Sequence, residues 1–94
     1  MPLEMRFHEG KWCPVVVCDH CGERIESACD GNNEWRQDDP TPRFIHKRCS
    51  NAFEDSHGGR AAWLSGELRV FCIYLADNLN LDDKQARRLA NLAV

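Results

Sequence analysis

Apolar positions in the last third of the chain recur at helical spacing and predict two helices. The first helix, expected over residues 63–79, carries two apolar stripes, so we expect it to be buried on more than one side. One stripe consists of Leu64, Leu68, Phe71, Cys72, Leu75 and Leu79, and the other consists of Trp63, Val70 and Tyr74.

The second helix is expected to begin after Leu81. Asp82 can cap its N-terminus, and Gln85 follows three residues later, where a capping box needs it. The inner face of this helix is apolar and its outer face is basic. Ala86, Leu89, Ala90 and Ala93 form the inner face, and Lys84, Arg87 and Arg88 share the outer face.

The middle of the chain alternates between short β-type runs and turn residues. Val15–Val17 is a β-branched run that predicts a strand leading into Cys18. Residues 30–33 give the strongest turn signal, so segments 24–29 and 34–37 are expected to pair as a β-hairpin. Residues 38–42 are expected to form a loop, because Pro40 and Pro42 have no N–H to donate.

A short helix is expected next, after a brief extended segment at residues 43–45. Cys49, Ala52 and Phe53 lie at i, i+3 and i+4, which is helical spacing. Gly58 and Gly59 then favour the end of the helix.

Four residues in this region have the spacing of a metal site. Cys18 and Cys21 are separated by two residues, 24 residues follow, and His46 and Cys49 are again separated by two. Two such pairs can close a tetrahedron of three thiolates and one imidazole, which favours one structural zinc ion per chain. Two alternatives are an iron–sulfur cluster with mixed ligands and ordinary buried cysteines beside a surface histidine.

These four ligands, with a hairpin between the pairs and a helix after them, resemble a treble-clef zinc finger. Their order and spacing are most similar to the first zinc module of LIM domains, over about residues 15–57. The chain departs from LIM domains in having a longer gap between the pairs and no second ligand set after Cys49. The resemblance implies zinc binding and a recognition role, but it does not specify the partner.

The expected fold is therefore α+β, with a small zinc module followed by two C-terminal helices that pack on it. We expect one domain over residues 1–94. It is divided into an N-terminal arm at 1–12, the zinc module at 13–59 and the helical pair at 60–94.

The three other cysteines are expected to be bystanders. Cys13 lies five residues before Cys18 and could alternatively replace a ligand. Cys29 is expected in a strand, and Cys72 is expected as a buried free thiol on the apolar stripe.

We expect a small intracellular protein that is not an enzyme. No run of eighteen apolar residues occurs and Met1 is not followed by a secretory signal, so we expect neither a membrane span nor secretion. In a reducing compartment, paired cysteines favour metal over disulfides. We expect no catalysis, because no motif frames a nucleophile outside the metal ligands.

Two binding functions remain open, and the first is favoured. A protein-interaction adaptor would use the second apolar stripe of Trp63, Val70 and Tyr74. A nucleic-acid-binding accessory protein would use two basic clusters, although nearby acidic residues weaken their field. These clusters are Arg43, Lys47 and Arg48 beside the zinc helix, and Lys84, Arg87 and Arg88 on the last helix.

The second apolar stripe also raises the question of what covers it. One expectation is a homodimer in which the stripe meets its equivalent on a second copy. The alternative is that the N-terminal arm, through Phe7 and Trp12, folds back over it.

Overall fold

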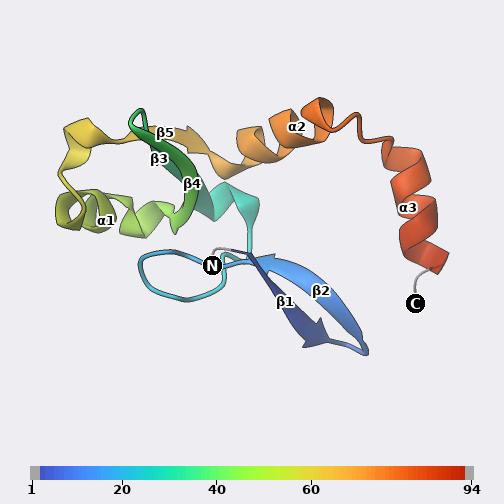
Figure 1. The fold of residues 1–94 in the computed structure, drawn as a ribbon. Coiled ribbons are helices and arrows are strands. Elements are labelled where there is room, and N and C mark those ends of the chain that lie inside the picture. The colour runs from blue at the N-terminus through green and yellow to red at the C-terminus, as the bar shows by residue number, and fades with distance from the viewer. Residues whose placement is uncertain (1–2, 93–94) are drawn as a thin grey trace.

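The computed structural model describes residues 3–92, and their fold is α+β as expected. Five strands, three α-helices and three short 3-10 turns follow one another along the described chain (Figure 1). The strands are β1 (Leu3–His8), β2 (Lys11–Val16), β3 (Gly31–Arg36), β4 (Asp39–His46) and β5 (Leu64–Glu67). The α-helices are α1 (Ser50–Ser56), α2 (Leu68–Asn78) and α3 (Asp83–Leu92), and the 3-10 turns are η1 (Ala28–Asp30), η2 (Lys47–Cys49) and η3 (Arg60–Ala62).

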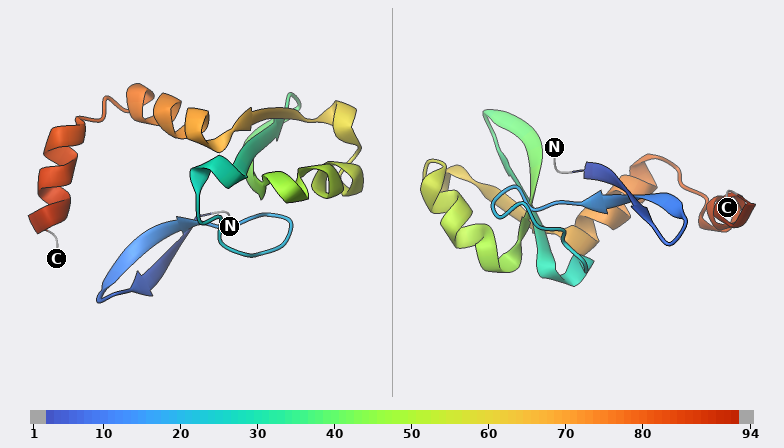
Figure 2. Two further views of the ribbon diagram at one scale, coloured as in Figure 1. Left: turned by 180° about the vertical axis from the view of Figure 1, so that it is seen from behind. Right: turned by 90° about the horizontal axis from the view of Figure 1, so that it is seen from below.

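The strands form two separate antiparallel sheets. β1 and β2 make a hairpin of their own, so residues 3–8 are an ordered strand of this hairpin. The second sheet has the order β4-β3-β5, with β3 in the centre. α1 lies beside this sheet, and α2 continues directly from β5 (Figures 1 and 2).

The main hairpin differs from the one expected at 24–29 and 34–37. The observed strands are β3 and β4, and the chain turns at residues 37–38 rather than 30–33. The Asn32–Asn33 pair lies inside β3 because that strand is hydrogen-bonded on both sides, which outweighs the local turn propensity. Segment 24–29 makes only one bridge, Val17 to Arg24, before η1.

The loop expected at 38–42 is also wrong, because residues 39–42 belong to β4. β4 is an edge strand, with β3 on one side and no described strand on the other. An edge strand tolerates proline, since an N–H on its free side has no ladder partner to lose. Pro40 and Pro42 are accordingly exposed on this strand.

The short helix after the second ligand pair is confirmed as α1. It buries Phe53, and the chain leaves it through Gly58 and Gly59, whose φ angles are +99° and +89°. Both residues adopt backbone conformations that favour glycine.

The long helix expected over 63–79 is instead a strand followed by a helix. Leu64–Glu67 forms β5 on the free edge of β3, and only Leu68–Asn78 is helical. Trp63 therefore lies apart from Val70 and Tyr74. Its ring centroid is 5.0 Å from that of Phe53 on α1, and its Nε1–H donates to the carbonyl oxygen of His57 at 2.9 Å.

The hydrophobic core is small and includes two of the expected ligands, Cys18 and Cys49. α2 contributes one fully buried side chain, Leu68, and Phe71 packs its ring edge-on against Phe44 at 5.1 Å. The buried cluster consists of Cys18, Ile25, Phe44, Ile45, Cys49, Phe53 and Leu68.

The two C-terminal helices do not both pack on this core. α3 has no buried residue, and it projects from the end of α2 on the same side as the tip of the β1–β2 hairpin (Figures 1 and 2). The hairpin does not cover α2, since Val70 and Tyr74 keep 46% and 65% of their surface exposed. The fold-back of the N-terminal arm is therefore wrong. No helix within residues 3–92 is long and apolar enough to cross a membrane.

Candidate metal centre

The first ligand pair lies in a tight turn that directly follows β2. The amide N–H of Gly22 donates to the carbonyl oxygen of Cys18 at 3.0 Å, and that of Cys18 donates to the oxygen of Glu23 at 2.9 Å. Gly22 has a φ of +76°, which lets the backbone turn back immediately after Cys21. The turn therefore holds both sulfur atoms on one side of the chain.

The second pair lies where β4 meets α1. His46 is the last residue of β4, and Cys49 is the last residue of η2, directly before α1. Asp19 ties the two pairs together: its N–H donates to the Phe44 oxygen at 2.8 Å, and its Oδ2 accepts from the Phe44 N–H at 3.0 Å.

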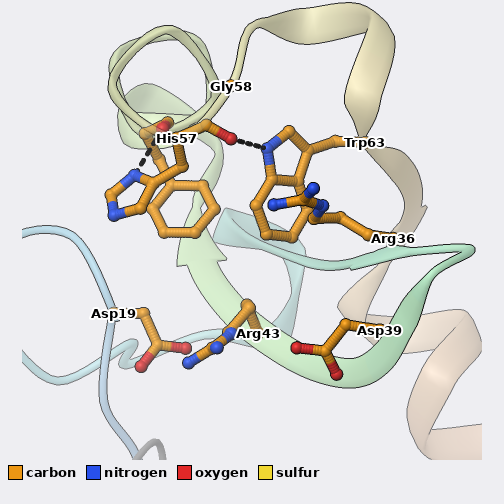
Figure 3. Close-up of a pocket in the computed structure, with 8 residues that line it drawn as sticks. Asp19, Arg36, Asp39, Arg43, His57, Gly58 and Trp63 are labelled. Atoms are coloured by element: carbon orange, nitrogen blue, oxygen red, sulfur yellow. Dashed lines mark hydrogen bonds between the residues drawn. The ribbon is translucent and has the colours of Figure 1, made fainter.

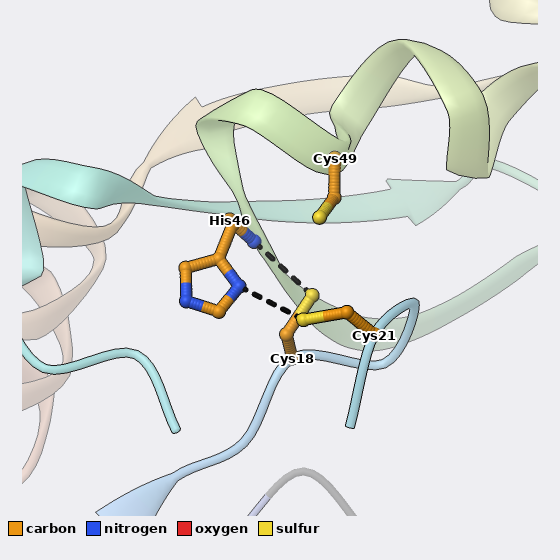
Figure 4. Close-up of side chains that lie close together, drawn as sticks. All are labelled: Cys18, Cys21, His46 and Cys49. Carbon is orange, nitrogen blue, oxygen red and sulfur yellow. Dashed lines mark hydrogen bonds between the residues drawn. The ribbon is translucent and has the colours of Figure 1, made fainter. Parts of the chain in front are cut away.

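These contacts bring the four expected ligands into one cluster (Figure 4). One ligand atom from each of Cys18, Cys21, His46 and Cys49 lies within 4.8 Å of all the others. Cys21 Sγ and His46 Nδ1 are 3.4 Å apart. Tetrahedral Zn²⁺ with ordinary Zn–S and Zn–N bonds places its ligand atoms about 3.5 to 3.8 Å apart. The donor set and its spacing thus fit one tetrahedral metal ion.

His46 is oriented for metal binding through Nδ1. Its Nε2 lies 3.2 Å from the carbonyl oxygen of Arg24. A carbonyl can only accept, so the proton belongs on Nε2 and the lone pair on Nδ1, which faces the sulfur atoms (Figure 4). This is the outer-shell arrangement that fixes the tautomer of metal-ligating histidines.

The thiols are not equally easy to ionise. Burial raises the pKa of Cys18, but N–H groups directed at its sulfur outweigh burial and lower the pKa to about 7. Two of these donors are the backbone N–H groups of His20 at 3.4 Å and His46 at 3.3 Å. Burial, together with the neighbouring Cys18 and Cys21 sulfurs, raises the pKa of Cys49 to about 11. Three thiolates in this space therefore need a cation to compensate their charge.

The chain matches no protein-family model, no curated protein and no solved structure.

The remaining cysteines lie outside this cluster. Cys13 is half-buried on β2, and it is not among the clustered ligands of the described chain. Cys29 is exposed in η1 rather than in a strand, and its sulfur lies 3.0 Å from Ser27 Oγ. Cys72 is exposed, so its expected burial on α2 is wrong. That side of α2 faces solvent because the helix packs only through its first turn.

Several side chains of the predicted basic clusters lie beside acidic residues. Lys47 pairs with Glu67 at 3.0 Å, and Arg87 pairs with Asp83 at 2.9 Å. Arg48 lies in a different hollow from Arg43, next to Glu23, Glu26 and Asp30. Lys84 and Arg88 are exposed on α3.

A pocket of about 330 Å³ was not predicted from the sequence (Figure 3). One wall is aromatic: His57 stacks on Phe53 with centroids 4.3 Å apart, and the guanidinium of Arg36 lies 5.8 Å from the ring centroid of Trp63. The opposite wall places Arg43 between Asp19 and Asp39 (Figure 3). The negative charges of these two carboxylates would repel a phosphate group that approached Arg43.

Proposed function

We propose that the chain is a zinc-stabilised recognition module of treble-clef type. The observation that carries this proposal is the convergence of Cys18, Cys21, His46 and Cys49 on one tetrahedral space. The order of the elements supports it: a metal-binding turn, then the β3–β4 hairpin, then the last ligand directly before α1. This order resembles the treble clef, and the ligand pattern resembles the first zinc module of LIM domains.

The metal in this proposal is structural. Four protein ligands fill a tetrahedron and leave no position for water or substrate, as in structural zinc sites. Cys18 and Cys49 are also part of the hydrophobic core, so the metal would join β2, β4 and α1 where they meet. The chain would act by binding rather than by catalysis.

We favour a protein partner over nucleic acid. Apolar side chains on α2 and on the β1–β2 hairpin are exposed, whereas several predicted phosphate-binding side chains lie beside carboxylates. The two basic clusters also lie on separate parts of the molecule, α3 and the end of β4. Protein interfaces use exposed apolar patches of this kind.

The test measures whether capture of a protein partner depends on the metal, and how DNA binding depends on salt concentration. Host extract is passed over immobilised wild-type chain and over Cys18→Ser, and a specific protein captured only by the zinc-loaded wild type is expected. Labelled single-stranded and duplex DNA are titrated in parallel, and only weak binding that disappears with added salt is expected. Tight DNA binding that persists at physiological salt would favour the nucleic-acid alternative and contradict the adaptor.

A further inference from the structure

A groove of about 230 Å³ lies between α2 and the central sheet. Trp35 lies on its sheet side, and Val70, Phe71, Tyr74 and Leu75 of α2 lie on its other side. Phe71 is half-buried, but the remaining α2 side chains are 46% to 65% exposed. The groove therefore presents a largely apolar surface that no described element of the chain covers.

α3, in turn, has an apolar face that no described element covers. It has ten residues and buries none of them, and Leu89 is 56% exposed. Isolated helices of fewer than about 12 to 15 residues are marginal in water, and most gain their stability by packing an amphipathic face. The inner face of α3 combines Leu89 with the small residues Ala86 and Ala90, so a neighbouring element can approach its backbone closely.

No residue of α3 lines the groove of its own chain, and the corner between the two helices is capped on both sides. α2 ends in a Schellman motif: the Leu81 N–H donates to the Ala76 oxygen at 3.0 Å and the Asn80 N–H to the Asp77 oxygen at 3.2 Å. Asn80 has the left-handed φ of +53° that this motif requires. Asp82 follows at once as the N-cap of α3, its Oδ1 accepting from the Gln85 N–H at 3.0 Å. These bonds order the last turn of α2 and the first turn of α3 on either side of the corner.

The shape of the molecule reflects this corner. Its radius of gyration is 15.0 Å, whereas a compact domain of this length has about 12 Å. α3 stands clear of the zinc module in every view (Figures 1 and 2). α3 is thus capped at its start, buries no residue and is open to another molecule.

We infer that the chain forms a two-fold homodimer in which α3 of each copy lies in the α2 groove of the other. One chain supplies both an uncovered groove along the 11-residue α2 and an uncovered helix of 10 residues, and a two-fold axis can pair each with its counterpart on the second copy. This interface replaces the helix-to-equivalent-helix contact expected from the sequence. It pairs Leu89 and Ala86 of one copy with Val70 and Tyr74 of the other.

Sedimentation velocity and native mass spectrometry test the inference on the zinc-loaded full chain. The wild type is expected to be dimeric at high micromolar concentration. Val70→Glu in the groove and Leu89→Glu on α3 are each expected to weaken the dimer about a hundredfold, because the two-fold axis repeats each change in two contacts, each worth about tenfold. Met5→Glu replaces an equally exposed apolar residue on β1 and is expected to leave the dimer unchanged.

Mixing a groove variant with an α3 variant identifies the pairing. The mixture combines Val70→Glu with Leu89→Lys. In their heterodimer one contact carries neither substitution and the other sets the two introduced, opposite charges against each other, whereas each homodimer carries a substitution in both contacts. An equimolar mixture is therefore expected to favour the heterodimer. A monomeric wild type, dimers that survive both substitutions, or a mixture without heterodimer would each overturn the inference. Zinc content measured in the same spectra shows whether the variants are folded, and it reports on the metal centre independently of dimerisation. Leu89→Glu decides the result if Val70→Glu fails to fold.

Discussion

The Nε2 atom of His46 lies 3.2 Å from the backbone carbonyl oxygen of Arg24, two residues beyond the turn that carries the first ligand pair. Like the hydrogen bonds between Asp19 and Phe44, this contact joins the two halves of the metal centre. It also commits Nδ1, the ring nitrogen nearer the backbone, to the metal.

A prediction about His46 follows from this orientation. Nδ1 reaches about as far from the backbone as a cysteine sulfur, so His46→Cys is expected to retain about one zinc per chain as a four-cysteine site. His46→Ala is expected to lose the metal. Elemental analysis of the purified variants measures both. Ligation through Nε2 would be indicated instead if His46→Cys lost zinc as completely as His46→Ala.

The spare cysteines provide matched controls for the ligands. Cys13→Ser and Cys29→Ser are expected to keep full zinc content, because neither sulfur belongs to the cluster. Cys72→Ser is expected to change the free energy of unfolding by less than about 0.5 kcal/mol, since its side chain is exposed. Urea unfolding at fixed free zinc measures this. A Cys13→Ser chain that releases metal would show that the ligand set is wrong.

Glu34 is expected to make stability depend on pH. Its side chain is fully buried in β3, and neither carboxylate oxygen has a hydrogen-bond partner among the described residues. Burial, followed by the neighbouring Glu54, raises its pKa from 4.5 to about 7. The folded chain thus holds this proton more tightly than the unfolded chain, so the contribution of Glu34 to stability is complete below pH 4.5 and is lost as pH rises through about 7.

The test compares Glu34→Gln with the wild type at pH 6 and pH 8. The free energy of unfolding of the variant minus that of the wild type is the quantity compared. This difference is expected to be about 1 kcal/mol larger at pH 8 than at pH 6, since glutamine does not titrate. Urea unfolding at both pH values measures this difference. The contributions of groups that titrate in both proteins cancel in it. A difference that does not change with pH would mean that Glu34 ionises normally.

Leu68 is expected to be the main anchor of α2. It is 3% exposed, and its Cδ2 atom would lie only 2.8 Å from a Cβ atom placed on Gly31. Leu68→Ala is therefore expected to cost about 2 to 4 kcal/mol of unfolding free energy. Leu79→Ala is the control, since Leu79 is 70% exposed and should change stability little. Equal effects of the two substitutions would contradict this assignment.

The ligand set was the most predictable part of this molecule. Cys18 and Cys21, like His46 and Cys49, are close in sequence, so their spacing alone indicates how each pair can share an ion. α1 and α3 were likewise predictable, because local signals at Gly58 and Asp82 mark where these helices end or begin.

The errors concern pairing between distant segments. Asn32 and Asn33 have turn propensity, yet they lie in a central strand because β4 and β5 pair with both of its sides. Leu64 fits a helical stripe, yet it extends as β5 because the open edge of β3 is available. Neither partner strand is visible in the local sequence, which is why periodicity misplaced the hairpin and lengthened α2.

In the proposed function, a structural zinc ion bound by Cys18, Cys21, His46 and Cys49 holds the fold together. Structural zinc contributes on the order of 10 kcal/mol of apparent binding free energy, more than so small a core can lose. The most direct measurement combines elemental analysis with circular dichroism during chelator titration. We predict about one zinc per chain, with unfolding as it is removed and refolding when zinc returns. A chain that stays fully folded without metal would contradict the account.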